Sequence, residues 1–318
     1  MRIRIGTRAS NLARAQTGHV AEALAAATHA EVEIVHIRTR GDDLQKYQGA
    51  PTPNLGVGLF TKALQEALLR DEIDLAVHSL KDLPCETAPG FHLAAIPPRV
   101  DPADALVARD GLTFEALPKG ASVGTGSPRR RALLALRRPD LDIRAIRGNI
   151  ETRMGRLEET GERRCDAVVL AYAGLLRTDQ QDRMTDKLEI LPAPGQGALG
   201  LEVRADDTAR AELVAQIDDS RTRLATAAER RLHQALGGGC LAPFGALATI
   251  TDGRIHLEGC VASMDGKRSI RGSAEDALER LEDVVAAVAK QLLDGDAKDI
   301  LEEARRTLEA IKGPEDQS

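Results

Sequence analysis

The sequence predicts an α/β protein of two domains followed by a small α+β domain. Short apolar strands alternate with amphipathic helices over most of the chain, beginning with the strand–helix–strand unit of residues 2–37. Segments rich in proline or glycine at 97–98 and 192–197 mark points where the chain crosses between domains. From about residue 221 a helix precedes short strands joined by Asp-Gly turns, and Ser273 is expected to cap a last helix.

The two crossings set the domain boundaries that we expect, and they imply a hinge. The first domain comprises residues 1–98 and 198–217, the second residues 99–197, and the α+β domain residues 218–313. Residues 43–58 carry two prolines and three glycines and show neither helical nor strand periodicity. This segment predicts a long loop of the kind that forms lids.

Composition and charge narrow the class of protein. The chain has 318 residues, 42% of them hydrophobic, which is enough for well-packed cores. Its net charge is −6 and only 2% of its residues are aromatic, so nucleic acid is not an expected partner. The amino terminus has no apolar signal region and no stretch is long enough to span a bilayer, so we expect a cytoplasmic protein that does not bind membranes.

The four cysteines, at 85, 165, 240 and 260, include no Cys-x-x-Cys pair, so neither a disulfide framework nor a metal site is predicted. Cys240 directly follows three glycines, at 237–239. Glycine has no Cβ and lets a bulky group approach the sulfur, which favours attachment or reactivity. A glycine-rich helix end with Cys240 packed behind it explains this stretch equally well.

Three polar residues, Ser79, Lys81 and Asp82, follow the predicted strand 73–78. In open α/β sheets, ligands bind beyond the carboxyl ends of the strands. Asp82, beside Lys81, is therefore a candidate acid or base. The alternative is that Asp82 only caps a turn before Pro84, which is a more common role of aspartate in such segments.

A second polar segment, residues 124–131, follows another predicted strand and opens a helix. Backbone donors at a helix start, hydroxyl groups and guanidinium groups together suit carboxylate or phosphate oxygens. Other arginines follow other predicted strands, whereas a solvated basic face explains the remaining ones. The candidate anion-binding residues are Arg8, Thr125, Ser127, Arg129, Arg130, Arg147 and Arg153.

Six motifs, in register along nearly the whole chain, resemble those of the porphobilinogen deaminase (hydroxymethylbilane synthase) family. Each motif is weak alone, but six in the same order are specific. They are Thr7-Arg8-Ala9-Ser10-Asn11-Leu12-Ala13, His78-Ser79-Leu80-Lys81-Asp82-Leu83-Pro84, Ser127-Pro128-Arg129-Arg130, Ile146-Arg147-Gly148-Asn149 with Arg153, Pro194-Gly195-Gln196-Gly197-Ala198 and Gly238-Gly239-Cys240.

The resemblance implies two periplasmic-binding-protein-like domains with a central active-site cleft, and a third domain that carries a dipyrromethane cofactor joined to Cys240 by a thioether. The implied enzyme is a transferase of tetrapyrrole and heme biosynthesis. It polymerises four porphobilinogen molecules with loss of ammonia and releases hydroxymethylbilane by hydrolysis. Asp82 would assist the loss of ammonia and stabilise the resulting cation. The expected partners are porphobilinogen and the growing polypyrrole chain, and the protein is expected to be a monomer.

The resemblance also assigns binding residues, in which arginines would pair with acetate and propionate groups. The cofactor-binding residues would be Cys240, Lys81, Ser127, Arg129 and Arg130. The substrate-binding residues would be Arg8, Ser10, Thr125, Arg147, Arg153, Arg177 and Gln196. One departure concerns the loop before residue 60, where Val57 and Pro53 replace two lysines that the family usually carries.

Two other classes of function compete with this one. A two-domain anion-binding or effector-sensing protein without catalysis would share the arginines, but it needs neither Asp82 nor Cys240. Covalently bound pyrrole would distinguish the two. A nucleic-acid binder would show a steep salt dependence of oligonucleotide binding.

Overall fold

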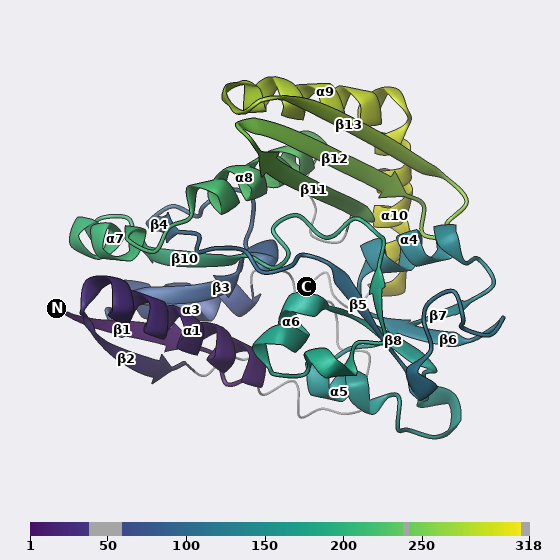
Figure 1. Cartoon of the computed structure of the whole chain (residues 1–318), viewed down its shortest axis with the longest axis horizontal. Coiled ribbons are helices and arrows are strands. Elements are labelled where there is room, and N and C mark those ends of the chain that lie inside the picture. The colour runs from purple at the N-terminus through teal and green to yellow at the C-terminus, as the bar shows by residue number, and fades with distance from the viewer. Residues whose placement is uncertain (38–58, 238–241, 313–318) are drawn as a thin grey trace. The chain divides into compact units, whose positions relative to one another are not determined.

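The computed structural model describes residues 1–37, 59–237 and 242–312 (Figure 1). They form two compact units: the described residues of Met1–Val100 with Gly197–Leu224 make up the first, and those of Asp101–Gln196 with Ala225–Ser318 the second. Each unit contains a five-stranded sheet, and the second unit also contains a three-stranded antiparallel sheet. The predicted fold class, two α/β sheets and a small α+β domain, is confirmed. The predicted lid, residues 43–58, and Cys240 lie outside the described residues.

The sheet of the first unit has the order β2-β1-β3-β10-β4. Strands β1, β2 and β3 are parallel, whereas β10 runs antiparallel to its two neighbours, β3 and β4. Helices α1, α3 and α7 cover the sheet. The bounds are Arg2–Thr7 (β1), Asn11–Thr28 (α1), Glu31–His36 (β2), Leu59–Leu69 (α3), Leu75–Ser79 (β3), Phe91–Ala95 (β4), Leu199–Arg204 (β10) and Thr208–Ala215 (α7).

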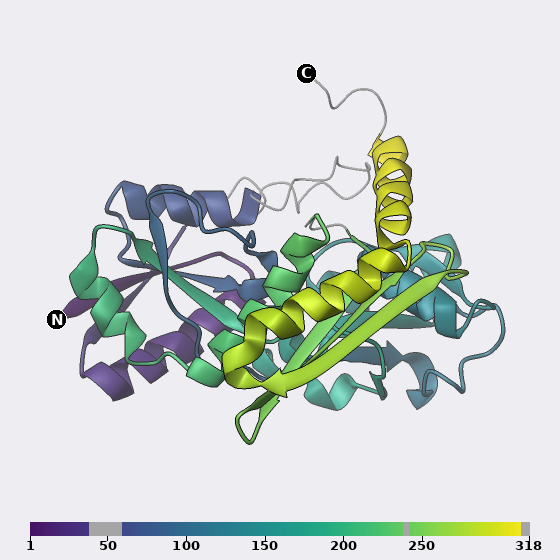
Figure 2. The same ribbon diagram turned by 90° about the horizontal axis from the view of Figure 1, so that it is seen from above.

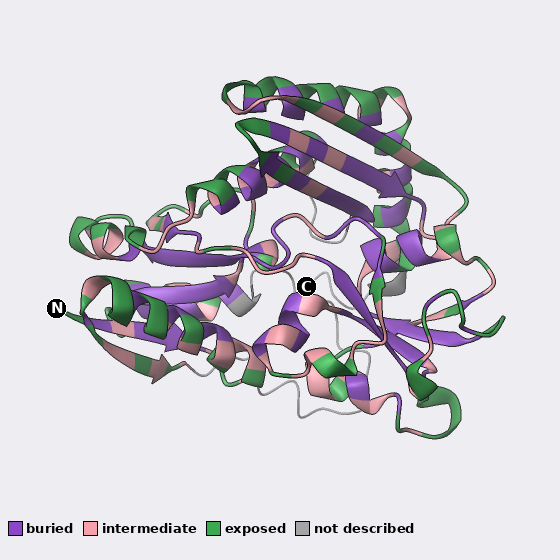
Figure 3. Ribbon diagram, viewed as in Figure 1, coloured by how far each residue is buried: buried purple, intermediate pink, exposed green. Residues whose placement is uncertain are grey.

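Alternation along β3 assigns the helices to the two faces of this sheet. Leu75 and Val77 join a core that contains residues of α1 and α7. Ala76, between them, packs with Leu64 and Leu68 of α3. Successive residues of a strand point to opposite faces, so α1 and α7 lie on one face and α3 on the other. The edge strand β2 stays partly exposed, while the central strands are buried (Figure 3).

The sheet of the second unit has the order β7-β6-β8-β5-β9, with β6, β7 and β8 parallel and β5 antiparallel to β8 and β9. The two large sheets therefore share one topology. In each sheet one strand, β10 or β5, runs antiparallel to its neighbours. It is the first strand that the chain forms after it crosses into that unit. The bounds are Asp104–Ala108 (β5), Ser122–Thr125 (β6), Pro128–Arg137 (α4), Asp142–Ala145 (β7), Ile150–Gly155 (α5), Ala167–Ala171 (β8), Tyr172–Arg177 (α6) and Asp186–Leu188 (β9).

The third sheet has the order β11-β12-β13 and packs its apolar side chains with those of helices α8, α9 and α10. Helix α9 lies along the sheet, and α10 continues at a steep angle to it (Figure 2). The bounds are Ser220–Ala235 (α8), Phe244–Thr251 (β11), Arg254–Ala262 (β12), Ser269–Ala277 (β13), Leu281–Asp294 (α9) and Ala297–Lys312 (α10).

The predicted Asp252-Gly253 turn is confirmed. It joins β11 to β12, and both residues have positive φ, 50° and 70°, as the central residues of a type I′ hairpin turn do. The predicted cap at Ser273 is wrong. Ser273 lies inside β13, opposite Glu258, and α9 begins only at Leu281.

Within the second unit, the three-stranded sheet packs directly against the part of the unit that contains the five-stranded sheet. The Ala246 N–H donates to the Pro192 carbonyl at 3.0 Å. A Cβ at Gly245 would lie 2.6 Å from the Leu191 carbonyl oxygen, so glycine is needed for this close approach. Cys260 belongs to the same buried cluster as Leu133 of α4. These contacts explain why the α+β domain groups with residues 101–196.

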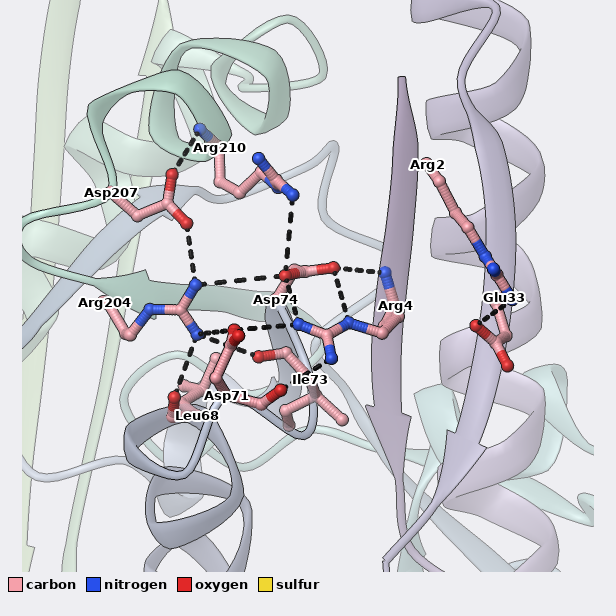
Figure 4. A network of polar contacts seen from close by, with 10 residues as sticks. All are labelled: Arg2, Arg4, Glu33, Leu68, Asp71, Ile73, Asp74, Arg204, Asp207 and Arg210. Carbon is pink, nitrogen blue, oxygen red and sulfur yellow. Dashed lines mark hydrogen bonds and ion pairs between the residues drawn. The ribbon is translucent and has the colours of Figure 1, made fainter.

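A buried aspartate binds several arginines at the amino-terminal edge of the first sheet (Figure 4). Asp74, directly before β3, is 2% exposed. Its carboxylate accepts hydrogen bonds from Arg4 at the backbone nitrogen (2.8 Å), Nε (3.1 Å) and Nη2 (2.9 Å). Arg204 and Arg210 approach the same carboxylate at 3.9 and 3.8 Å. Burial alone would raise the pKa of Asp74, but the hydrogen bonds and charge of Arg4 outweigh it, and the pKa is lowered.

Asp74→Asn should lower the free energy of unfolding at pH 7 by about 2–3 kcal/mol, since it leaves several cations without their anion. The folded-state pKa of Asp74 is lowered, so its contribution is present above the pKa of the unfolded chain, about 4, and is lost as the pH falls further. Denaturant titrations at pH 7 and pH 3.5 measure the difference between the two proteins. It should shrink at the lower pH, and a constant difference would contradict this role.

Candidate active site

The topology marks a binding edge in each unit. Chain order reverses between β1 and β3 in the first sheet and between β6 and β8 in the second. In open α/β sheets such a reversal places ligands beyond the carboxyl ends of the two strands. In the first unit these ends lead into residues 8–10 and 80–82, and in the second into residues 126–130 and α6. The structure thus places the predicted polar segments where this class of sheet binds ligands.

Asp82 lies on a short 3₁₀ turn, Leu80–Asp82, that directly follows β3. Leu80, the first residue of the turn, and Leu83, directly after it, are buried. The Leu80 N–H donates to the Ala198 carbonyl at 3.0 Å, and the Leu83 N–H closes the turn onto the Leu80 carbonyl at 3.2 Å. Asp82 itself is exposed. Backbone bonds and two buried leucines therefore hold the turn, which leaves the Asp82 carboxylate at its surface.

Buried polar contacts fix the strand that leads to Asp82. The Nε2 of His78 lies 3.2 Å from an oxygen of Glu202 on β10, and both side chains are buried. Gln65 of α3 donates to both oxygens of Glu202 at 3.1 Å. One residue further along β3, the Ser79 hydroxyl accepts a hydrogen bond from Gln16 of α1 at 2.8 Å. Residues of β10 and α1 thus contact the end of β3 directly, and α3 binds the Glu202 carboxylate that His78 faces.

Two predicted site serines also cap helices. The Ser10 hydroxyl accepts a hydrogen bond from the Ala13 N–H at 3.3 Å and begins α1. The Ser127 hydroxyl accepts from the Arg130 N–H at 3.4 Å and begins α4, with Pro128 in the first turn. The buried hydroxyl of Thr125 accepts from the Ser127 N–H at 3.2 Å. These bonds fix the turn after β6 in the shape that presents Arg129 and Arg130.

Arg129 and Arg130 meet around one aspartate, Asp104. All three side chains are at least 95% buried. Arg129 Nη1 donates to Asp104 Oδ2 at 2.6 Å, and Arg130 Nε donates to Oδ1 at 2.9 Å. Burial alone would raise the pKa of Asp104, but the charges of Arg129 and Arg130 outweigh it and hold the pKa far below its usual range. The group contains two cations and one anion.

Gln196 joins this group from the crossing segment. Its Nε2 donates to Asp104 Oδ1 at 2.8 Å and to the Pro102 carbonyl at 2.6 Å. Arg129 Nη1 also donates to the Leu191 carbonyl at 2.7 Å. The neighbouring Gly195 N–H donates to the buried carboxylate of Glu229 on α8, at 2.7 Å. The segment from Leu191 to Gln196 therefore contacts both the arginine pair and the α+β domain.

The remaining predicted arginines of the second unit lie on the turn after β7 and on helices α5 and α6. Arg147 is exposed after β7, and Arg153 of α5 donates to the Gly148 carbonyl at 2.9 Å. A Cβ at Gly126 would lie 2.6 Å from the Ile146 carbonyl oxygen, so the turns after β6 and β7 approach closely. Arg177 of α6 is buried, and burial lowers its pKa to about 10. It is still charged at neutral pH.

Sequence reasoning missed three buried polar residues, Asp104, Glu202 and Glu229, and the partly buried Gln65. Among the described residues, no group of His, Cys, Asp and Glu side chains is arranged to hold a metal ion. No helix in the described ranges has the length and apolarity needed to cross a membrane. Cys165 and Cys260 are free thiols, and both are buried.

The fold and the two polar edges define a two-unit α/β protein suited to anionic ligands. Two family models cover most of the chain. The model for "Porphobilinogen deaminase, dipyromethane cofactor binding domain" matches residues 3–212, and that for "Porphobilinogen deaminase, C-terminal domain" matches residues 223–294. The chain belongs to the porphobilinogen deaminase family, whose members are transferases. The resemblance inferred from the six motifs is confirmed.

Curated relatives agree with this assignment. The porphobilinogen deaminase of Mycolicibacterium gilvum is 46% identical over 316 residues, which cover 96% of this chain and 99% of that protein. The porphobilinogen deaminase of Nocardia farcinica is 46% identical over 317 residues, covering 96% of this chain and 89% of the relative. Among solved structures, the methionine binding protein MetQ is 11% identical, with a TM-score of 0.42 over 68% of this chain and 89% of that one.

Proposed function

We propose that this protein is a hydroxymethylbilane synthase. It joins four porphobilinogen molecules with loss of ammonia, onto a bound dipyrromethane cofactor, and then releases hydroxymethylbilane by hydrolysis. The observation that carries this proposal is the match of both family models and of 46%-identical relatives over nearly the whole chain. The placement of Asp82 and of the arginines at the carboxyl edges supports it.

The residues of the second unit fit a dipyrromethane, which carries two carboxylates on each pyrrole. Arg129, Arg130 and Asp104 together carry one net positive charge in a buried place, and Nε of Arg129 is buried without a hydrogen-bond partner among the described atoms. An arriving carboxylate would supply both the missing charge and an acceptor. When bound, the cofactor supplies the pyrrole carbon to which the first substrate is joined.

We propose that the dipyrromethane is joined to the sulfur of Cys240 by a thioether bond. Helix α8 ends at Ala235, five positions before it, so the cysteine follows directly from a helix that is packed into the α+β core. Lys81, Ser127, Arg129 and Arg130 would bind the cofactor carboxylates. The domains that we propose are residues 1–98 with 198–217, residues 99–197, and residues 218–313.

Asp82 is assigned the chemical step. Loss of ammonia needs a proton on the leaving amine and a negative group facing the cation that develops on the pyrrole. An exposed carboxylate on a turn fixed by Leu80 and Leu83 can do both, because its position is set by the fold while it stays accessible to substrate.

The growing chain needs several cations, since each addition brings two more carboxylates. The proposed substrate-binding residues are Arg8, Ser10, Thr125, Arg147, Arg153, Arg177 and Gln196. Guanidinium groups bind carboxylates through two parallel hydrogen bonds, which gives orientation as well as charge. We further propose that the protein acts as a monomer in the cytoplasm.

Incubation of the purified protein with porphobilinogen tests the proposed function. Ammonia should appear in equal amount to the substrate consumed, and one hydroxymethylbilane should form for every four substrate molecules. A protein that binds porphobilinogen tightly without releasing ammonia would instead be the anion-binding alternative. A matched incubation of Asp82→Asn separates catalysis from contaminating activity.

A further inference from the structure

Asp104 occupies the binding edge because of the direction of its strand. It is the first residue of β5, which runs antiparallel to β8 and pairs Asp104 with Ala171, the last residue of β8. The beginning of β5 therefore lies at the carboxyl edge, next to the turn that carries Ser127 and Arg129. In the proposed reaction, Asp104 itself contacts neither the cofactor nor the substrate.

Both oxygens of Asp104 are engaged by the proposed cofactor-binding and substrate-binding side chains. Oδ2 accepts from Arg129 Nη1 at 2.6 Å. Oδ1 accepts from Arg130 Nε at 2.9 Å and from Gln196 Nε2 at 2.8 Å, and it lies 2.8 Å from Arg130 Nη2. The aspartate is 0% exposed. One carboxylate thus sets the positions of three neighbouring side chains.

Removing the negative charge of Asp104 would leave the positive charges of Arg129 and Arg130 unbalanced. Two guanidinium groups would remain buried side by side with no anion, and like charges at such a distance repel strongly in a dry site. Arg130 has a second anchor, since its Nη1 donates to the Val169 carbonyl at 3.0 Å, and Arg129 has one at the Leu191 carbonyl. The two side chains would therefore separate around these anchors while the fold around them persists.

We propose that Asp104 is a positioning residue of the reaction, which fixes the spacing and the single net charge with which Arg129 and Arg130 meet carboxylates of the cofactor or the substrate. The proposal rests on the proposed function. It predicts an effect on binding and cofactor loading that exceeds any effect on the chemical step, because Asp82, on the first unit, is left unchanged.

Asp104→Asn tests this, since the amide keeps the shape and removes the charge. In purified, folded protein we expect the fraction that carries dipyrromethane, measured by intact mass, to fall at least twofold. In the loaded fraction we expect KM for porphobilinogen to rise about tenfold, with kcat changed less than threefold. Asp104→Glu keeps the charge but displaces it by one methylene, so it should fold more readily and still raise KM.

Asp74→Asn is the matched control. Asp74 is equally a buried aspartate held among arginines, but it lies at the amino edge of its sheet, at the opposite end of β3 from Ser79. It should lose stability while its KM and cofactor content stay at the wild-type values. If Asp104→Asn behaves like this control, Asp104 stabilises the fold only and the inference is overturned. If wild-type protein neither carries pyrrole nor consumes porphobilinogen, the proposed function itself fails.

Discussion

Asp82→Asn should slow the release of hydroxymethylbilane by about a hundredfold to ten-thousandfold, the range that a positioned acid or base contributes. The amide keeps the shape of the side chain but supplies neither a proton nor a negative charge. The melting temperature should not change, because Asp82 is exposed and its turn is held by the Leu83–Leu80 backbone bond and two buried leucines.

The measurement is the rate of product release by protein whose pyrrole adduct has first been verified by intact mass. Asp82→Glu serves as the companion variant. It preserves the charge at a displaced position, so it should retain part of the activity. A rate for Asp82→Asn within a few-fold of wild type, at unchanged melting temperature, would make Asp82 a turn residue and move the catalytic carboxylate elsewhere.

Local patterns were sufficient to predict the elements that carry the site. The strand before Asp82 and the helix start at Ser127 depend on nearby residues, namely an apolar run followed by polar ones, and a capping serine followed by proline. Ser10 caps α1 for the same reason. The arginines at strand ends followed from these assignments, because the carboxyl ends of parallel strands meet at one edge.

The direction of β5 could not be predicted from the sequence. Asp104 was missed for that reason, because the direction of β5 decides at which edge of the sheet Asp104 lies. The apolar run that follows Asp104 is typical of a strand, but only its pairing with β8, about 60 positions along the chain, shows that the strand runs antiparallel. The local sequence of an apolar strand does not indicate which other strand it pairs with. A parallel β5 would have placed Asp104 at the amino edge, away from the arginines that it holds.

Two other misses have the same origin. Gln65 and Glu202 are separated by 137 positions, so no local pattern relates them to each other or to His78. Ser273 resembles a helix cap because a helical segment follows it, but the pairing of Ser269–Ala277 with β12 extends past it and delays the helix to Leu281. In both cases long-range packing outweighed local preference.

Cys240→Ala should abolish the cofactor and with it nearly all activity. The protein denatured in acid should no longer colour with an aldehyde reagent for pyrroles, because no other thiol is assigned to hold the group. Cys85→Ala and Cys260→Ala are the matched controls, since each removes one thiol and should leave the colour unchanged. Cys260 is buried, and burial raises the pKa of its thiol, so it is a poor nucleophile.

The central claim is that this chain builds its product on a dipyrromethane held by Cys240. The intact mass of the acid-denatured protein tests it most directly, because a thioether survives denaturation while a bound ligand does not. Wild-type protein should exceed the mass of its sequence by one dipyrromethane, and Cys240→Ala should match its own sequence. A wild-type protein at the bare mass after exposure to porphobilinogen, or an adduct that persists in Cys240→Ala, would contradict the account.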